Sequence, residues 1–280
     1  MAPFIEIVEK AQGLHLDRQQ EKRIKGFHAS QGGYCTKKVI IEAMFPESKK
    51  PLPMPTRRLF EIGHEFHDQM DRVLRHYARV TADLLWIQPW QMETFSKAMT
   101  EAYNGETDAE SPLPLKVFGT PDFIGIDVKS GKLLFSDFKT SNERAFAMKK
   151  KGNRSANYAV QIGTYLPGIY TMFKRLGMPT DFKEINILYI SKADRGLISH
   201  NYEAGYLIPM AKAYWEQVAR EFAQFIATGG NILPLGNPPE DWMCRYCSMF
   251  AGKTECNRVL DTGTLERMTS SEGKQDALFT

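Results

Sequence analysis

The fold is decided in residues 117–140, which read VFGTPDFIGIDVKSGKLLFSDFKT. Two runs rich in β-branched and aromatic residues, Val117–Asp127 and Lys132–Thr140, flank the polar, glycine-containing segment Val128-Lys129-Ser130-Gly131. Such runs on either side of a short turn segment are typical of two paired strands. The stretch therefore predicts a β-hairpin.

The register of this hairpin determines which side chains meet. The pattern favours a two-residue turn at Ser130-Gly131. Asp122 then lies opposite Lys139, and Asp137 lies opposite Ile124. Because side chains alternate along a strand, the two acids and the lysine emerge on one face, at one end of the hairpin. The rest of that face is apolar and consists of Ile124, Ile126, Val128, Leu133 and Phe135.

The tripeptide Asp-x-Lys is not specific by itself. It occurs at Asp137–Lys139, and again at Asp127–Lys129 and Asp181–Lys183. Asp127–Lys129 falls in the predicted turn, and Asp181–Lys183 precedes a predicted strand without a second acid nearby. Only Asp137–Lys139 shares a predicted face with another carboxylate.

Two carboxylates and a lysine beside a buried face are costly unless they are paired or bound to a metal ion. Phosphodiester hydrolysis uses hard cations such as Mg²⁺ or Mn²⁺, which carboxylate oxygens bind, to neutralise the phosphate and activate a water molecule. A nearby lysine can orient the water or stabilise developing charge. A solvated salt-bridge cluster is the alternative interpretation.

The segments around the hairpin predict an α/β protein. Helical patterns cover Thr36–Met44, Thr56–Val80, Ala156–Leu176 and Ile208–Thr228, and further strands are expected at Ile185–Ser191 and Leu197–Tyr202. Thr56 is an expected N-cap. Its helix has an apolar stripe expected to be buried, made of Leu59, Ile62, Phe66, Met70, Val73 and Tyr77. Pro167 should kink or interrupt its helix.

Two of these helices add polar residues to the candidate site. Gln161 and Tyr165 are four residues apart and share one helix face. His67 follows Gly63 by four residues, and a glycine allows close backbone approach. A lone histidine on such a helix is more often structural than a ligand, and His64 is an alternative candidate.

The charge distribution is more informative than the total. The formal net charge is +3, from 36 Lys and Arg against 33 Asp and Glu, which does not itself indicate nucleic-acid binding. One compact basic run contains Arg18, Lys22, Arg23 and Lys25, and another contains Lys149, Lys150, Lys151 and Arg154. The second run lies between the hairpin and the Gln161 helix, which favours contact with phosphates over ordinary surface charge.

The chain has no run of about 18 apolar residues and no readable secretory signal. We therefore expect a cytoplasmic protein that does not enter a membrane. In a reducing compartment, the four cysteines Cys35, Cys244, Cys247 and Cys256 indicate a metal site or buried thiols rather than disulfides. Four thiolates suffice for one Zn²⁺ or one 4Fe–4S cluster, and zinc is the commoner use.

Four motifs follow one another along the chain: Gly63-x-x-x-His67, Pro121-Asp122, Asp137-Phe138-Lys139 and Gln161-x-x-x-Tyr165. In this order they resemble the motifs of RecB-family nucleases within the PD-(D/E)xK superfamily, over about Cys35 to Cys256. The resemblance implies a restriction-endonuclease-like core with a mixed central sheet flanked by helices. It also implies metal ligation by His67, Asp122, Asp137 and the main-chain carbonyl of Phe138. Lys139 would be the catalytic lysine, and Gln161 and Tyr165 would contact DNA or support the site.

One cysteine before the core and three after it resemble the iron–sulfur nucleases of this family, including AddB and the CRISPR-associated spacer-acquisition exonucleases. This resemblance implies a 4Fe–4S cluster. Tyr34-Cys35-Thr36 resembles the first-cysteine motif, although Thr36 stands where proline is common. The eight residues between Cys247 and Cys256 make a longer gap than usual, so zinc stays an alternative.

Together these features predict a single nuclease domain over residues 1–261, with a helical N-terminal region, a C-terminal iron–sulfur loop, and a polar tail at 262–280. We expect a metal-dependent exonuclease that acts on single-stranded or end-bearing DNA in recombination, repair or replication, with a helicase or recombination protein as partner. The alternatives are a non-catalytic DNA-binding or scaffolding module of the same fold, and a zinc-stabilised RNA-processing nuclease.

Overall fold

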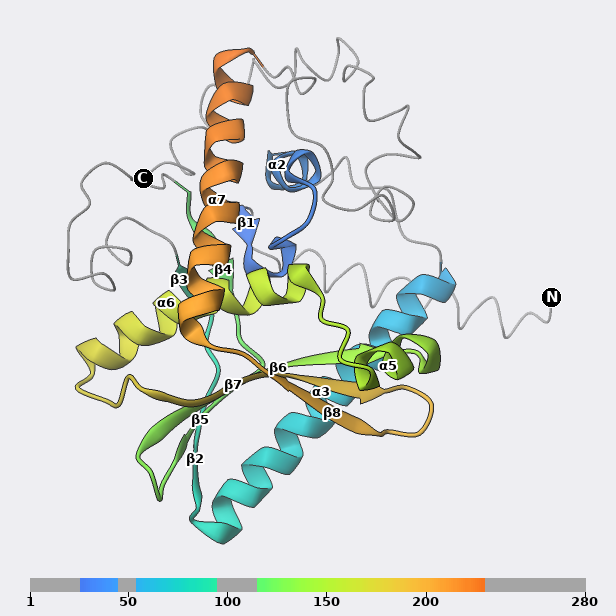
Figure 1. The fold of residues 1–280 in the computed structure, drawn as a ribbon, viewed down its shortest axis with the longest axis vertical. Helices are drawn as coiled ribbons and strands as arrows, with labels where there is room; N and C mark the ends of the chain where they lie inside the picture. The colour runs from blue at the N-terminus through green and yellow to red at the C-terminus, as the bar shows by residue number, and fades with distance from the viewer. Residues whose placement is uncertain (1–25, 45–53, 95–114, 230–280) are drawn as a thin grey trace, which may run out of the picture.

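The computed structural model describes residues 26–44, 54–94 and 115–229. The basic run at residues 18–25, the cysteines Cys244, Cys247 and Cys256, and the predicted tail at 262–280 lie outside these residues. The elements in chain order are β1 Phe27–His28, η1 Ala29–Gln31, α2 Thr36–Met44, α3 Met54–Thr81, β2 Leu84–Ile87, β3 Met92–Thr94, β4 Val117–Gly119, β5 Phe123–Asp127, β6 Lys132–Ser141, α5 Glu143–Lys150, α6 Ala156–Arg175, β7 Phe182–Ser191, β8 Leu197–Asn201 and α7 Ala204–Ala227 (Figure 1).

A five-stranded sheet with the order β2-β5-β6-β7-β8 forms the centre. Strands β6 and β7 are parallel, and all other neighbours are antiparallel. The chain crosses from β6 to β7 through α5 and α6. Helices α6 and α7 lie on one side of the sheet and α3 lies on the other (Figure 1). The expected α/β architecture, a mixed central sheet flanked by helices, is confirmed.

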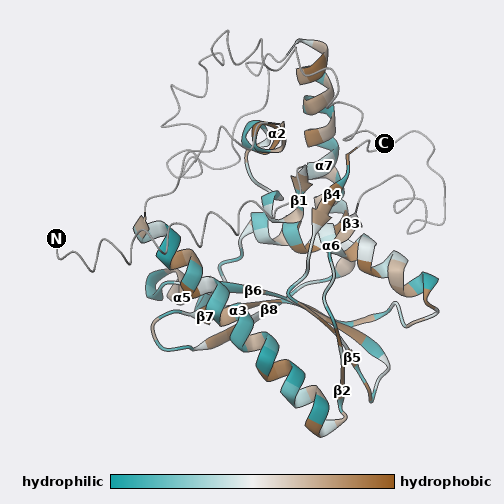
Figure 2. Ribbon diagram, turned by 180° about the vertical axis from the view of Figure 1, so that it is seen from behind, coloured by the Kyte–Doolittle hydropathy of each residue, from teal (hydrophilic) through white to brown (hydrophobic). Residues whose placement is uncertain are grey.

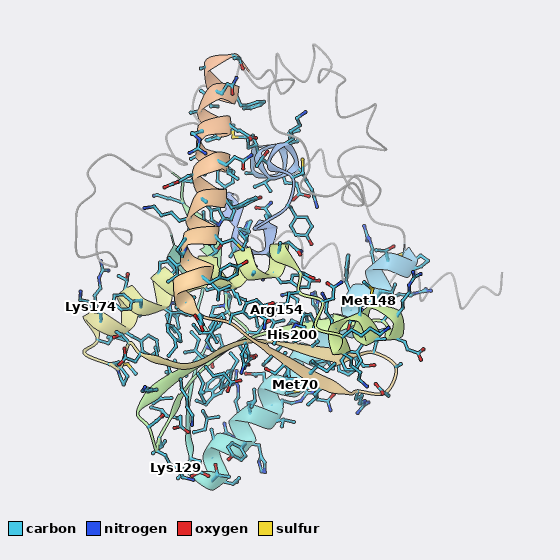
Figure 3. All side chains as sticks on the ribbon, viewed as in Figure 1. Met70, Lys129, Met148, Arg154, Lys174 and His200 are labelled. Carbon is cyan, nitrogen blue, oxygen red and sulfur yellow. The ribbon has the colours of Figure 1, made fainter. Side chains whose placement is uncertain are left out.

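Alternation along the strands supplies a separate apolar core to each face. On one face, residues such as Ile124, Phe135 and Ile187 pack against α6. On the other face, Phe123 and Phe138 pack against α3 through a group that includes Phe66 and Met70. Figure 3 shows Met70 on the α3 side of the sheet and Arg154 and His200 on the opposite side. Neighbouring residues of β6 therefore face different helices.

The hairpin forms, but its predicted register is wrong by two residues. Phe123 pairs with Ser136 and Asp127 pairs with Lys132, so the turn contains four residues instead of two. Asp127 closes the longer turn because its Oδ2 accepts hydrogen bonds from the Ser130 backbone N–H at 2.9 Å and from the Ser130 hydroxyl. Gly131 has φ +66°, a conformation that glycine adopts readily. An even shift keeps every side chain on its predicted face.

Helix α3 is placed as predicted, but the predicted buried stripe is wrong. Thr56 lies inside the helix instead of capping it. Phe66 and Met70 pack against the sheet, together with Leu74 and Ala78. The other stripe residues, Leu59, Ile62, Val73 and Tyr77, are exposed. Figure 2 shows hydrophilic residues along the length of α3, interrupted by hydrophobic ones. Periodicity gave the helix correctly but not its rotation about its own axis.

Two other predictions need correction, and one further helix is present. The expected strand Val117–Asp127 is divided into β4 and β5, and β4 joins a second sheet of order β1-β4-β3. Pro121 lies at this break, where its missing N–H interrupts no ladder. Helix α6 is continuous through Pro167. Residues 143–150, to which the sequence assigned no element, form α5, which Asn142 caps by accepting the Ala145 N–H at 2.9 Å. Among the described residues, no helix is long and apolar enough to cross a membrane.

Candidate active site

Two strands and one helix bring the predicted acidic residues together. Asp137 and Lys139 lie two residues apart on β6, and Asp122 immediately precedes β5. The observed hairpin register, continued by one residue, sets Asp122 opposite Asp137. Helix α3 crosses nearby because Gly63 lies close to β6: a Cβ there would be 3.2 Å from the Thr140 hydroxyl. The expected close approach at Gly63 is confirmed.

Both oxygens of Asp122 have partners. His67 Nδ1 lies 3.2 Å from Oδ1, and the backbone N–H of Phe138 donates to Oδ2 at 2.7 Å. The ring of His67 also contacts the ring of Phe138 edge-on, with 5.8 Å between centroids. His64 is exposed and takes no part. Of the two histidines, His67 is therefore the one that meets the carboxylates.

Asp137 is the buried centre of the site, with a side chain that is 2% exposed. Lys139 Nζ lies 2.5 Å from its Oδ2. Gln161 Nε2 lies 3.4 Å from its Oδ1 and donates to the Tyr165 hydroxyl at 3.2 Å. Gln161 and Tyr165 thus share a face of α6, as their spacing predicts, and that face points at Asp137.

The two carboxyl groups have opposite electrostatic environments. Burial raises the pKa of Asp137 to about 6, with Lys139 opposing this rise and Asp122 adding to it. Burial acts in the same direction on Asp122, but the hydrogen bond and charge of His67 and the charge of Lys139 outweigh it, so the pKa of Asp122 lies below its ordinary value. Such a divergence between neighbouring acids is characteristic of functional sites.

The surroundings of the two basic side chains favour their charged forms. Burial lowers the pKa of His67, but Asp122 more than compensates and leaves it raised. Burial likewise opposes ionisation of Lys139, and the charges of Asp137 and Asp122 raise its pKa above the ordinary value. Two acidic and two basic side chains therefore form one compact cluster.

The other two Asp-x-Lys tripeptides have a different geometry. Lys129 pairs with Asp83 at 3.5 Å, and Lys183 pairs with Asp127 at 3.0 Å. In both tripeptides the lysine reaches an acid outside its own tripeptide, and both lysine side chains are exposed. Only Asp137 and Lys139 pair with each other in a buried position.

The cluster has the donor types of a divalent-cation site, but its side chains pair with one another. Within residues 26–44, 54–94 and 115–229, no three His, Cys, Asp or Glu side chains form a group that could hold a metal ion. His67 occupies one oxygen of Asp122, and Lys139 approaches Oδ2 of Asp137. That buried Oδ2 has no well-directed hydrogen bond among the described residues. An incompletely satisfied carboxylate oxygen next to a second carboxylate fits the chemistry of a hard divalent cation.

The basic run beside the site divides into an inner and an outer part. Lys149 is buried, donates to the Ser155 hydroxyl at 2.6 Å, and lies 5.1 Å from the ring centroid of Tyr189. This internal position is not the phosphate contact that the sequence predicted for Lys149. Lys150, Lys151 and Arg154 are exposed, and Arg154 stacks over the ring of Tyr202 at 4.7 Å.

Cys35 is the one predicted cluster ligand within the described residues. It is buried, and its carbonyl accepts the Val39 N–H at 3.1 Å, which makes it the residue from which α2 begins. The neighbouring residue Tyr34 is tied to α7 because its carbonyl accepts the Tyr214 hydroxyl at 3.0 Å.

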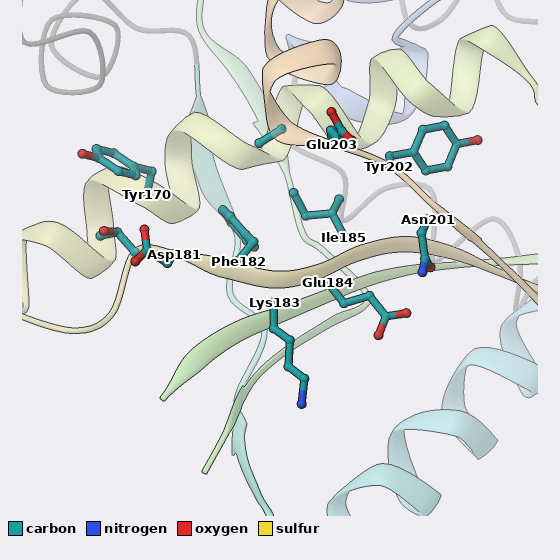
Figure 4. Close-up of a pocket in the computed structure, with 11 residues that line it drawn as sticks. Tyr170, Asp181, Phe182, Lys183, Glu184, Ile185, Asn201, Tyr202 and Glu203 are labelled. Atoms are coloured by element: carbon teal, nitrogen blue, oxygen red, sulfur yellow. The ribbon is translucent and has the colours of Figure 1, made fainter. Parts of the chain in front are cut away.

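A separate surface pocket of about 470 Å³ opens where β7 begins and α7 starts (Figure 4). Its lining residues include Tyr170, Asp181, Phe182 and Glu203, and none of the residues of the acidic cluster. The pocket and the cluster are therefore different features.

Tyr158 is a neighbour of the cluster that the sequence reasoning missed. Lys139 Nζ lies 5.2 Å from its ring centroid. It precedes Gln161 by three residues on α6, so the helical spacing that joins Gln161 and Tyr165 also includes Tyr158. An aromatic residue on that face, directly after a basic run, was the available signal.

No protein-family model matches this chain, and no curated protein matches it. Among solved structures, the crystal structure of SSO0001 is similar, with a TM-score of 0.47 and 15% sequence identity, over 88% of this chain and 93% of that chain. A similarity at this level concerns the general fold only.

Proposed function

We propose that this chain is a metal-dependent DNA nuclease with a core of the PD-(D/E)xK type. The observation that supports this most is the buried pair of Asp137 and Lys139, 2.5 Å apart, beside Asp122, whose position the Phe138 N–H fixes. Two acids with divergent pKa values and a charged lysine are the groups that phosphodiester hydrolysis requires. The order of the motifs supports the RecB-family resemblance.

His67, Asp122, Asp137 and the main-chain carbonyl of Phe138 would hold Mg²⁺ or Mn²⁺. When bound, the cation would neutralise the phosphate and lower the pKa of a water molecule. Lys139, freed from Asp137, would orient that water or stabilise charge that develops on the phosphate. Gln161 would keep Asp137 in place, and Tyr165 would support Gln161.

Single-stranded or end-bearing DNA is the proposed substrate, and exonucleolytic cleavage is the proposed mode. The exposed residues Lys150, Lys151 and Arg154 lie at the end of α5 and in the segment that leads into α6, so a phosphate backbone that reaches Lys139 would pass them. We further propose that Cys35 joins Cys244, Cys247 and Cys256 in a 4Fe–4S cluster that acts structurally, and that the protein works with a helicase or recombination partner in the cytoplasm.

Two other functions are separable by experiment. A non-catalytic DNA-binding module would bind DNA without cleaving it, although the intact Asp122, Asp137 and Lys139 argue against that reading. A zinc-stabilised RNA-processing nuclease would prefer RNA and contain zinc.

The deciding test incubates the purified protein and Mg²⁺ or Mn²⁺ with DNA labelled at either end, and with RNA of the same sequence. Metal-dependent ladders from DNA support the nuclease, and the labelled end that shortens gives the polarity. DNA that stays intact with both metals would contradict the proposal.

A further inference from the structure

The segment before α2 lies directly on the start of α6, next to the candidate active site. Gly33 has φ +73°, and a Cβ on it would be 2.5 Å from the Cα of Asn157. A Cβ on Gly32 would be 3.2 Å from the backbone nitrogen of Gln161. Only residues without side chains permit this approach. It brings the residues that follow, Tyr34 and Tyr158, into one neighbourhood.

Each of these tyrosines is half-buried and has a lysine over its ring. Lys139 Nζ lies 5.2 Å from the ring centroid of Tyr158, and Lys38 Nζ lies 4.9 Å from that of Tyr34. Neither phenol oxygen has a hydrogen bond among the described residues, whereas buried tyrosines usually find one. Burial raises the pKa of Tyr158, Lys139 lowers it, and the nearby Tyr34 phenol adds to the rise.

We propose that Tyr34 and Tyr158 form a stacking site for an unpaired nucleobase of a DNA strand whose phosphate lies at Lys139; this inference rests on the proposed nuclease function. Aromatic rings beside cations are the combination by which proteins bind single strands without sequence preference. Each base has a free π-face only when it is unpaired, because stacking in a duplex covers both faces. The site would therefore favour single-stranded DNA or a frayed end over a closed duplex.

The position of the pair also connects it to the rest of the fold. Tyr34 immediately precedes Cys35, and its carbonyl is held by Tyr214 of α7. Tyr158 lies three residues before Gln161, which contacts Asp137. A base held between these two segments would fix the adjacent phosphate relative to Asp137 and Lys139, so the two tyrosines are positioning residues for the reaction.

The test measures binding without metal, so that cleavage cannot affect it. A single-stranded DNA carrying one 2-aminopurine, moved stepwise along the strand, is titrated with the protein in EDTA. Tyr158→Leu and Tyr34→Leu keep apolar bulk but remove the ring, and Tyr158→Phe keeps the ring. Tyr77→Leu, at an exposed tyrosine on α3, is the matched control.

We expect each leucine variant at the pair to bind about 5- to 150-fold more weakly, the loss that corresponds to one stacked base. At one 2-aminopurine position the wild type should quench the fluorescence, and Tyr158→Phe should do the same. The leucine variants at the pair should not. An abasic nucleotide at that position should weaken DNA binding by the wild type as much as the leucine substitutions do. It should cause no further loss of affinity in Tyr158→Leu.

Several results would overturn the inference. One is unchanged affinity and quenching in both leucine variants. Another is a loss of affinity for blunt duplex DNA as large as that for single-stranded DNA, and a third is tighter binding of RNA than of DNA. If the leucine variants unfold, the abasic scan of wild-type protein still decides, because no sensitive position would mean no stacked base. Cleavage by wild type without any stacking signal would remove this site and leave the nuclease proposal intact. A stacking signal without any cleavage would keep this site and remove the nuclease proposal.

Discussion

Replacing Asp137 with asparagine should abolish DNA cleavage without destabilising the fold at neutral pH, because the buried carboxylate is ionised there at a net cost in folding free energy. Burial raises the pKa of Asp137 from 3.8 to about 6. The contribution of Asp137 to the free energy of unfolding is therefore fully present below pH 3.8 and is lost as the pH rises through about 6. At neutral pH the loss amounts to about 3 kcal/mol. Asparagine is neutral at all pH values and removes this cost.

The same substitution leaves Lys139 without its partner. The raised pKa of Asp137 already includes the attraction of Lys139, so the loss of this ion pair belongs to the same balance and is not a second cost. The variant should therefore be at least as stable as the wild type at neutral pH, which thermal melting measures. Cleavage should fall at least about 100-fold, since a group that acts on the transition state is lost.

The assay combines gel analysis of end-labelled single-stranded DNA with thermal melting in the presence and absence of Mn²⁺. Saturating Mn²⁺, at about 100 times its dissociation constant, should stabilise the wild type by about 2.7 kcal/mol and the variant much less. Asp181→Asn, in the exposed Asp-x-Lys tripeptide, is the control and should behave like the wild type. Near-wild-type cleavage by Asp137→Asn, or equal stabilisation by Mn²⁺, would refute the placement of the site.

Four further predictions follow from other residues. Stabilisation by Mn²⁺ should weaken as the pH falls from 7.5 to 5.0, through the raised pKa of Asp137 near 6, because protons compete for its carboxylate; melting curves at both values check this. The double variant Lys150→Ala, Lys151→Ala should bind DNA of any sequence more weakly, and the slope of log affinity against log salt concentration should become shallower by about 1.4. A slope equal to that of the wild type would mean that both lysines are ordinary surface charges. Any single Cys→Ala change at Cys35, Cys244, Cys247 or Cys256 should bleach the brown colour of the protein and reduce its stability, whereas colourless protein with about one zinc per chain would replace the cluster by a zinc site. Gly163→Ala should destabilise the fold, because its Cβ would lie 2.3 Å from the Leu207 carbonyl oxygen, and Gly205→Ala, with nothing within 4 Å, should not; comparative melting separates them.

The sequence predicted those features that depend on local pattern. Alternation placed Asp137 and Lys139 on one face of β6, and spacing placed Gln161 and Tyr165 on one face of α6, which the fold turns toward Asp137. Each side chain of the hairpin lies on its predicted sheet face despite the wrong register, because the register differs by an even number of residues. The turn itself was not predictable from the preference for Ser-Gly alone, since the side chain of Asp127 stabilises the longer loop through Ser130.

The features that the sequence did not predict depend on tertiary packing. The apolar residues of α3 permit more than one buried stripe, and the stripe that is buried, with Phe66 and Met70, lies on the same helix face as the close approach at Gly63. The inward turn of Lys149 depends on Ser155 and Tyr189, which only the fold brings near it. Long-range neighbours of this kind leave no periodic signal.

The ion pairs of the cluster would let the same residues hold together without a metal ion and bind one in the proposed nuclease. His67 faces Asp122 and Lys139 faces Asp137. A divalent cation would replace these contacts when Lys139 moves away from Asp137 and His67 offers a neutral ring nitrogen. Burial makes an unpaired, ionised Asp137 costly, so Lys139 or the metal ion would have to neutralise this carboxylate whenever it is ionised. Lys139 would therefore be free to act on a phosphate only when the metal ion has taken its place, which couples metal binding to the availability of the catalytic lysine.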